Sequence, residues 1–599
     1  MQRADTLLKI IHERGKRGLP LNRLYRCLFN PDLYLRAYGR LYRNDGALTP
    51  GTTKETVDQM SLSKIQAIIV ALRDERYRWT PVRRVYIAKK NSTKKRPLGL
   101  PSWSDKLLQE VIRSLLEAYY EPQFSDHSHG FRPGRGCHTA LDALYRGWHG
   151  TTWFIEGDIK GAYDHVDHAL LVALLAEKIH DNRFLRLIRG LLQAGYMEEW
   201  CFNRTLSGVP QGGVVSPTLF NLYLDRLDRF IDTDILPAYN RGKRRTPYGP
   251  YKRLHRQMTR LAQHGHKEQA KVARRQLQHL PARDPHDPDY RRLRYLRYAD
   301  DWLLGFCGPR CEAEEIKRRI GTFLHDQLKL ELSEDKTLIT HGRTHAARFL
   351  GYDIVVLAND HKHDQHGHRN INGQIGLKVP ADVVQAKCRP YLRHGKPIHR
   401  MERMANTDFS IIAQFQAEYR GVVEYYQLAF NRSQFGRLKG VMQRSLTKTL
   451  AHKFRISVPA VYRRYRATLR TERGPRQGLR VTIDREGNRP PLVAQWGGIS
   501  LARKTTAVTL NDDPPCIWNS RQAELVQRLL ADTCELCGSQ EHVEVHHIRH
   551  LKDLRRKGRA DQPAWVKRMA ARRRKTLIVC RTCHEDIHAG RPLRQQHMA

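Results

Sequence analysis

The sequence lacks any apolar run that approaches the roughly 18 residues of a membrane-spanning helix, so no membrane is expected among its partners. No secretory signal peptide is expected either, because the opening residues MQRADTLLKIIHERGKRG are charged and have no continuous apolar core. A disulfide framework is also missing: seven of the 11 cysteines follow no regular spacing, and the total is odd. These absences argue against a secreted protein and favour a reducing compartment.

Acidic residues are scarce relative to basic ones. The 599 residues include 105 Lys and Arg against 61 Asp and Glu, which gives a formal net charge of +44 and a pI near 10.1. A compact fold with this charge repels itself unless a polyanion offsets it, and nucleic acid is the polyanion that fits best. The alternative is a basic protein without such a partner. The length allows several domains, each with its own core.

Three of the carboxylates occupy positions that predict a metal site. Asp300 and Asp301 are adjacent in RYADDWLLG, between two short apolar stretches that predict a β-hairpin with the carboxylates at its turn, and Asp158 ends the predicted strand in TTWFIEGDI. Carboxylates at neighbouring strand ends repel one another unless a cation lies between them, and an oxygen-rich site suits Mg²⁺. Taken alone, an Asp-Asp pair is also explained by a surface turn.

The grouped cysteines form two Cys-x-x-Cys pairs near the C-terminus, Cys534 with Cys537 and Cys580 with Cys583. Four thiolates at this spacing predict a structural Zn²⁺ site, which can stabilise a module too small for a large core. A redox role is the alternative, but no thioredoxin-like βαβ pattern surrounds the pairs.

Four histidines lie between and after these pairs. His546 and His547 are adjacent, so on a strand they point to opposite sides, whereas His584 and His588 are four residues apart and share one face of a helix. This arrangement can supply metal ligands and one free base. The alternative is a hydrogen-bonded histidine cluster without a catalytic role.

The remaining segments suggest the organisation of the chain. Apolar periodicity predicts a helix in SDKLLQEVIRSLLEAYYEPQF that Pro122 ends, and a loop runs into a helix N-terminus in SGVPQGGVVSPTLF. Residues 239–294 form a basic, helix-forming insertion, and residues 349–378 predict another hairpin. Residues 385–480 are expected to be helical, and residues 470–525, rich in Pro, Gly, Asn and Arg, to form a linker or small module.

Seven segments, in order and covering about residues 60–360, together resemble the reverse transcriptases encoded within group II introns. They are KKRPLGLPSWSDKLLQEVI, HGFRPGRGCHTAL, EGDIKGAYDHVDH, SGVPQGGVVSPTLFNLYLD, RYADDWLLGF, LSEDKT and ARFLGY. The segment with YRGVVEYY and TLAHK resembles the maturase domain of the same family. The resemblance implies a multidomain α+β protein with a right-hand polymerase, which has fingers, a palm with an antiparallel sheet and a helical thumb.

The resemblance also implies roles for individual polymerase residues. Asp158, Asp300 and Asp301 would be the catalytic triad that binds two Mg²⁺ ions. The other implied roles belong to residues around a bound dNTP: triphosphate contacts for Lys89 (or Lys90) and Arg96, a steric gate against ribose for Tyr163, a position beside the incoming base for Gln211, and protonation of the leaving pyrophosphate for Lys336. The alternatives are a core aromatic for Tyr163 and a surface charge for Lys336.

EVHHIRHL and CHEDIH resemble the HNH (ββα-metal) nuclease motif. By position, His546, His584 and His588 would hold a divalent ion, expected to be Mg²⁺, and His547 would activate water. Glu544 would orient a neighbouring group. His584 stands where many HNH nucleases have Asn, which leaves the metal preference open.

The expected domains are residues 1–380 (fingers and palm), 381–480 (thumb or maturase domain), 481–525 (DNA-binding segment or linker) and 526–599 (a zinc-stabilised HNH domain). The family function is RNA-directed DNA polymerisation, assistance to intron splicing and DNA nicking during intron mobility. The implied partners are intron RNA, target DNA, an RNA template and a DNA primer. The implied location is the bacterial cytoplasm, at the nucleoid when on DNA, or an organelle. The alternatives are a reverse transcriptase of another lineage, without a splicing role, and an RNA-binding splicing factor with an inactive polymerase.

Overall fold

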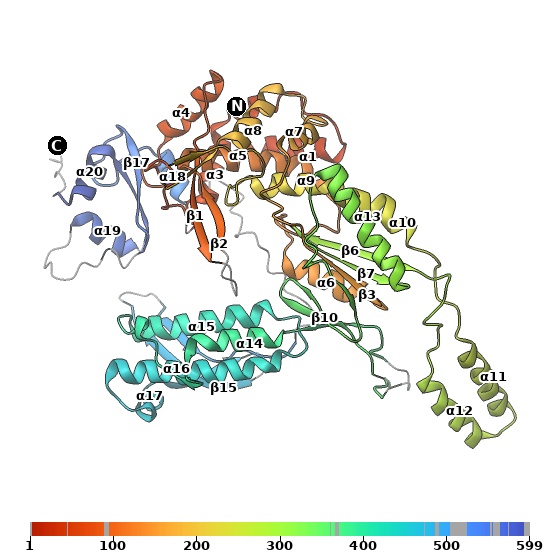
Figure 1. Ribbon diagram of the computed structural model, residues 1–599. Coiled ribbons are helices and arrows are strands. Elements are labelled where there is room, and N and C mark those ends of the chain that lie inside the picture. Colours follow the sequence, from red (N-terminus) through yellow and green to blue (C-terminus); the bar gives the residue numbers. More distant parts are fainter. Residues whose placement is uncertain are drawn as a thin grey trace.

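The chain forms a mixed α/β structure with several sheets and helical regions (Figure 1). The computed structural model describes residues 3–44, 46–88, 95–199, 201–359, 361–365, 370–471, 474–485, 490–503, 524–550, 554, 563–572 and 574–591. Within these ranges, no helix combines the length and the apolar character needed to cross a bilayer.

The N-terminal region is mainly helical. Its helices are α1 (Ala4–Lys16), α2 (Leu24–Cys27), α3 (Pro31–Leu41), α4 (Leu62–Arg73), α5 (Trp103–Tyr120), α7 (His168–Ala176), α8 (Asn182–Gln193) and α9 (Ser216–Phe230). The predicted helix before Pro122 is confirmed as α5, which begins where the Ser102 side chain accepts a hydrogen bond from the Asp105 amide. The adjoining sheet has the order β2-β1-β4-β5, with β1 (Val82–Ala88), β2 (Lys95–Leu100), β4 (Tyr196–Glu198) and β5 (Cys201–Asn203).

A four-stranded antiparallel sheet lies at the centre, in the order β6-β7-β3-β8. Its strands are β3 (Trp153–Gly157), β6 (Arg292–Tyr298), β7 (Asp301–Cys307) and β8 (Ile339–His341), with α6 (Cys137–Gly147) and α13 (Arg310–Leu328) beside them. The predicted hairpin is confirmed, since Tyr298 pairs with Asp301 across a tight turn. Gly157 is needed where it stands, because a Cβ there would lie 1.9 Å from the Trp302 ring.

The basic insertion projects away from the rest of the chain (Figure 1). As the sequence predicts, it contains helices, α11 (Gly249–Gln263) and α12 (Lys267–His279), which follow the short α10 (Leu236–Ala238). The second predicted hairpin is also confirmed: β10 (Tyr352–Val356) pairs with β11 (Ile375–Lys378), and β9 (Ala347–Phe349) completes this sheet.

The following region consists of α14 (Ala381–Cys388), α15 (Asp408–Tyr425), α16 (Phe435–Phe454) and α17 (Val458–Tyr465), with the short strands β12 (Leu392–Arg393) and β13 (Lys396–Pro397). The helical expectation for residues 385–480 is wrong at its end, where β14 (Arg466–Thr471), β15 (Gly474–Ile483) and β16 (Leu492–Trp496) form a sheet. The sheet forms because Trp496 is buried against Tyr419 of α15. The expected boundary at 480/481 therefore falls inside β15, and residues 504–523 of the expected DNA-binding segment lie outside the described residues.

The C-terminal region contains α18 (Glu524–Leu530), β17 (Val543–His547), α19 (Ala564–Arg572), β18 (Thr576–Cys580) and α20 (Arg581–Ala589). It lies beside the N-terminal helices, and α18 packs against α3, so segments far apart in the sequence are neighbours in space (Figure 1). The β17–β18 pair is buried on both faces. Val545 and Ile578 join the core of the N-terminal region, whereas Leu577 and Val579 join a smaller core of the C-terminal region.

Candidate active sites

Three carboxylates meet at one edge of the central sheet. Gly157 at the end of β3 pairs with Trp302 near the start of β7, so Asp158 and Asp301 lie at adjacent strand ends, and Asp300 precedes Asp301 in the turn. Burial, together with the charges of Asp300 and Asp158, raises the pKa of Asp301 to about 7. Burial also raises the pKa of Asp300. A divalent cation would relieve this repulsion, and carboxylate oxygens are ligands that suit Mg²⁺.

Basic side chains border the same edge. Lys336 Nζ donates to Asp158 Oδ2 at 2.5 Å, and this hydrogen bond is the main reason why the pKa of Lys336 is raised. Arg96 on β2 lies near enough for its charge to offset part of the rise in the pKa of Asp300. Lys89 lies outside the described residues. A phosphate chain that reached the carboxylates would therefore meet Arg96 and Lys336.

Tyr163 lies beside the carboxylates and packs on α9. Its ring stacks on Phe220 with the centroids 4.3 Å apart, and burial, followed by the charge of Asp300, raises its pKa. Gln211 lies against β2, because the Gly99 amide donates to the Gln211 carbonyl at 2.6 Å. Gln211 also lines a cavity of about 370 Å³. Asp164, which follows Tyr163, lines the same cavity.

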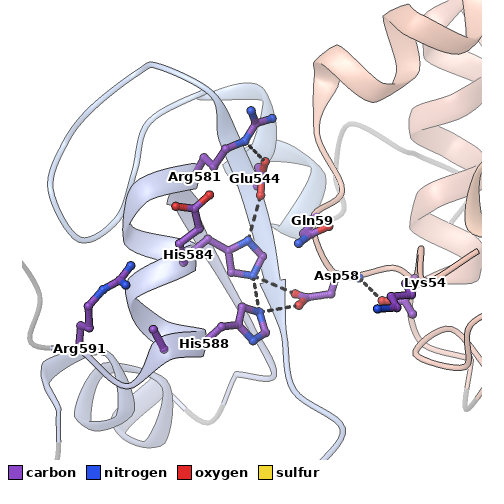
Figure 2. Close-up of a pocket in the computed structure, with 11 residues that line it drawn as sticks. Lys54, Asp58, Gln59, Glu544, Arg581, His584, His588 and Arg591 are labelled. Carbon is purple, nitrogen blue, oxygen red and sulfur yellow. Dashed lines mark hydrogen bonds and ion pairs between the residues drawn. The ribbon is translucent and has the colours of Figure 1, made fainter.

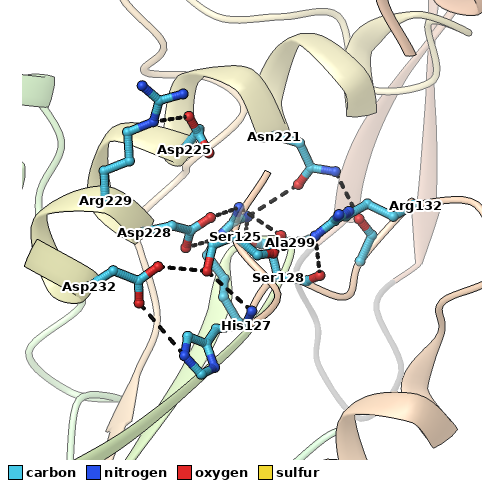
Figure 3. A network of polar contacts seen from close by, with 12 residues as sticks. Ser125, His127, Ser128, Arg132, Asn221, Asp225, Asp228, Arg229, Asp232 and Ala299 are labelled. Atoms are coloured by element: carbon cyan, nitrogen blue, oxygen red, sulfur yellow. Dashed lines mark hydrogen bonds and ion pairs between the residues drawn. The ribbon is translucent and has the colours of Figure 1, made fainter. Parts of the chain in front are cut away.

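A buried arginine holds the turn that carries Asp300. Arg297 is fully buried in β6, and four residues that accept hydrogen bonds from it lie close together in Figure 3: Ser128, Asn221, Asp228 and Ala299 of the turn. Each of its five N–H groups has an acceptor: Nε donates to Asp228 Oδ1 at 2.8 Å, Nη1 to Asn221 Oδ1 at 3.2 Å and to the Ala299 carbonyl at 2.9 Å, and Nη2 to Ser128 Oγ at 2.9 Å and to Asp228 Oδ2 at 2.6 Å. The backbone next to Asp300 is therefore fixed by a buried ion pair.

Four cysteines form a cluster in the C-terminal region. The sulfur atoms of Cys534, Cys537, Cys580 and Cys583 all lie within 4.8 Å of one another. Cys580 ends β18 and Cys583 lies in the first turn of α20, so the second pair spans a strand-to-helix junction. Four sulfur ligands at these distances fit Zn²⁺.

Three histidines form a second cluster next to it. His546 Nδ1 on β17 and His588 Nε2 on α20 each lie 3.1 Å from His584 Nε2. Glu544 orients His584, whose Nδ1 lies 3.0 Å from Glu544 Oε2 (Figure 2). The fourth member is Asp58, from the loop before α4. Three imidazole nitrogens and a carboxylate oxygen are suitable ligands for a divalent metal ion.

His547 points to the other side of β17, as the strand alternation predicts. Its Nε2 lies 3.3 Å from Tyr38 Oη, and only 8% of the residue is exposed. Burial lowers the pKa of His547 to about 4 and that of His546 to about 3. Both imidazoles are thus neutral at neutral pH, the state in which histidine binds a metal ion or accepts a proton.

Comparison with known proteins gives matches along most of the chain. Family models match residues 87–354 as "Reverse transcriptase (RNA-dependent DNA polymerase)", residues 378–474 as "Type II intron maturase" and residues 534–584 as "AI2M/AI1M-like, HNH endonuclease". The Group II intron-encoded protein LtrA of Lactococcus lactis subsp. cremoris is 37% identical over 94% of this chain and 95% of its own length. The chain belongs to the group II intron-encoded proteins.

Two further relatives are from yeasts. The uncharacterized 91 kDa protein in the cob intron of Schizosaccharomyces pombe is 34% identical over 94% of this chain and 69% of its own length. The putative COX1/OXI3 intron 1 protein of Saccharomyces cerevisiae is 29% identical over 95% of this chain and 69% of its own length. As a group II intron-encoded protein, the chain combines reverse transcriptase, maturase and HNH endonuclease functions.

Sequence reasoning missed two residues that lie at the candidate sites of this group II intron-encoded protein. One is Arg297, for which a signal existed: Leu293 and Tyr295 stand four and two residues before it, so Arg297 shares their face of the strand and needs a buried partner. The other is Asp58. Nothing in its loop, GTTKETVDQM, distinguishes it from other surface carboxylates.

Proposed function

We propose that the polymerase takes the form of a right hand and acts on RNA through the carboxylates Asp158, Asp300 and Asp301. In this assignment β1, β2 and the N-terminal helices are the fingers, the central sheet is the palm, and α14–α17 are the thumb. The observation that carries the proposal is the meeting of three carboxylates at one sheet edge, with burial and mutual repulsion that raise the pKa of Asp301 to about 7. Two bound Mg²⁺ ions would supply the positive charge that bridges phosphates.

The side chains around the three carboxylates bind and select the incoming dNTP in this proposal. Arg96, with Lys89, contacts the triphosphate, and Gln211 lies beside the incoming base. Tyr163 excludes a ribose 2′-hydroxyl, a role supported by its position next to Asp300 and its rigid stacking on Phe220. Lys336 is held protonated by its bond to Asp158, as a donor of a proton to pyrophosphate must be.

The C-terminal region is proposed to nick DNA. Cys534, Cys537, Cys580 and Cys583 would hold a structural Zn²⁺, and His546, His584 and His588 would hold a divalent ion that polarises the scissile phosphate. His547 would take a proton from the attacking water. Imidazole nitrogens favour a borderline ion such as Zn²⁺ over Mg²⁺, so metal analysis tests the Mg²⁺ expectation directly.

These activities fit one mobility cycle. The protein remains bound to its folded intron RNA, the RNA inserts into one DNA strand, the nuclease nicks the other, and the new 3′ end primes DNA synthesis on RNA. The net charge of +44 favours such a polyanionic partner. The expected location is a compartment that holds DNA, the bacterial cytoplasm or an organelle. The maturase match speaks against a lineage without splicing, and the intact carboxylates speak against an inactive polymerase.

Two variants test this division of labour in primer-extension and strand-specific cleavage assays on the same preparations. The double variant Asp300→Asn/Asp301→Asn should lose dNTP incorporation and keep nicking. His547→Ala should lose nicking by roughly 10²-fold and keep primer extension. Wild-type polymerisation by the first variant, or loss of primer extension in the second, would contradict the assignment.

A further inference from the structure

A carboxylate from the N-terminal region reaches the histidine cluster of the nuclease. Asp58 Oδ2 lies 3.0 Å from His588 Nε2, and Asp58 Oδ1 lies 3.3 Å from His584 Nε2 and 3.6 Å from His546 Nδ1 (Figure 2). The four potential ligand atoms all lie within 4.8 Å of one another. Asp58 therefore occupies the same small space as the three histidine nitrogens.

The backbone on both sides of Asp58 fixes this position. The Gln59 amide donates to the Val545 carbonyl at 3.1 Å, and the Val545 amide donates to the Met60 carbonyl at 2.9 Å, so the loop pairs with β17. The His547 amide donates to Asp58 Oδ1 at 2.7 Å. Met60 and Val545 are both fully buried at this contact. Asp58 is thus held by an interface and is not a mobile surface side chain.

The same interface covers the proposed general base. The His547 ring packs edge-on against Tyr38, 6.2 Å between centroids, and lies 6.5 Å from the ring of Tyr42. A DNA strand cannot approach His547 while α3 covers it. The arrangement therefore corresponds to a nuclease in a closed state.

We propose that Asp58 is the fourth ligand of the nuclease ion, so that the ion joins the N-terminal region to the nuclease and keeps the nuclease closed until a DNA phosphate replaces the Asp58 carboxylate. This inference rests on the proposed role of His546, His584 and His588. Its chemical basis is that four protein ligands complete a tetrahedral site, whereas a catalytic site keeps one position for water or substrate. Carboxylate and phosphate are both oxyanions, so one can take the place of the other.

A cleft beside the histidine cluster gives a DNA phosphate access to it. A cleft of about 740 Å³ runs past Asp58 and His588 and is lined by Lys54, Arg581 and Arg591. The side chain of His588 is 54% exposed to this cleft. Arg581 pairs with Glu544 and Arg591 with Asp586, and the charge that Lys54 adds to this lining favours a nucleic acid backbone over uncharged ligands.

The first test measures metal binding by the full-length protein with Co²⁺ as the probe. Cobalt in the cysteine site gives a thiolate charge-transfer band, which separates it from cobalt bound by histidine. Asp58→Asn keeps an acceptor for the His547 amide. It should lower the cobalt affinity of the thiolate-free histidine site by about 10-fold or more and leave the affinity of the cysteine site unchanged. Glu585→Gln, which removes the same charge from the same cleft, should bind both ions like the wild type.

The second test follows the interface by hydrogen exchange. The ion should slow exchange of the Gln59 and Val545 amides in the wild type, but not in Asp58→Asn. Addition of a target duplex should speed their exchange in the wild type. At an ion concentration that saturates both proteins, nicking by Asp58→Asn should exceed that of the wild type, because no carboxylate competes with the phosphate.

Unchanged cobalt affinity in Asp58→Asn, equal protection by the ion in both proteins, or nicking by the variant at saturating ion that does not exceed that of the wild type would each overturn the proposal. His588→Ala separates this failure from that of the proposed nuclease. If His588→Ala retains the thiolate-free cobalt site, the histidine assignment itself is wrong. If it loses that site while Asp58→Asn keeps it, only the role of Asp58 fails.

Discussion

Arg297→Lys should weaken the catalytic turn while it preserves the charge of the side chain. Arginine supplies five N–H donors in a planar fork, and all five are used here. Lysine offers three donors on one nitrogen, so at least two of the hydrogen bonds are lost. A charge-assisted hydrogen bond contributes about 1.5 kcal/mol or more, so the expected loss is about 3 kcal/mol. Both oxygens of Asp228 are buried, which leaves little water to replace the lost donors.

The assay for this loss is hydrogen exchange of the β6–β7 hairpin, which reports local opening of one region of a multidomain chain. A loss of about 3 kcal/mol corresponds to exchange about 100-fold faster. Primer extension should also fall, by at least about 10-fold, because the Ala299 carbonyl that Arg297 holds precedes Asp300. Nicking should be unchanged, since the nuclease residues lie in another region.

Arg294→Lys is the matched control, because Arg294 lies on the same strand and donates to the exposed His149 carbonyl. This variant should exchange and polymerise like the wild type. The reasoning is refuted if Arg297→Lys also exchanges and polymerises like the wild type, or if both variants lose polymerase activity to the same extent.

Three further outcomes are expected. Tyr163→Ala should raise the ratio of rNTP to dNTP incorporation, and an unchanged ratio would make Tyr163 a packing residue only. Cys534→Ser should release zinc and lower both nicking and DNA binding, whereas full zinc retention would exclude the four-sulfur site. Burial raises the pKa of Asp225 to about 6, against the opposing charge of Arg229. The folded state therefore holds this proton more tightly, and stability falls as the pH rises from about 4 to 6. Asp225→Asn should accordingly stabilise the protein by about 3 kcal/mol at pH 8 but not at pH 4. A stabilisation that is equal at both pH values would contradict this account.

Local patterns predicted the parts of both sites that depend on local geometry. The hairpin that bears Asp300 and Asp301 is visible in two short apolar stretches around a polar turn, and β6 and β7 form it. The opposite orientations of His546 and His547 follow from strand alternation, and the shared face of His584 and His588 follows from the helical repeat. Such features need only a few neighbouring residues to specify them.

Sparse patterns led to the wrong helical prediction for residues 466–480, which belong to the sheet of β14, β15 and β16. Only Leu469 is buried in β14, and β15 has a single buried residue, Leu479. Two buried positions on separate strands give no alternation that can be read along the sequence. The sheet depends on Trp496, which packs against α15 from more than 70 residues away.

The sequence by itself determined which groups can do chemistry: three carboxylates at strand ends, two cysteine pairs and histidines on a strand and a helix. Only the tertiary structure decided which distant residues contact those groups. Arg297 meets Asp228 across 69 residues of sequence, and Asp58 meets His547 across 489. Spacing along a chain specifies the direction of a side chain relative to its neighbours, but not which distant segment packs against it. That choice depends on burial of the whole core, where Val545 of β17 and the N-terminal helices share one apolar interior.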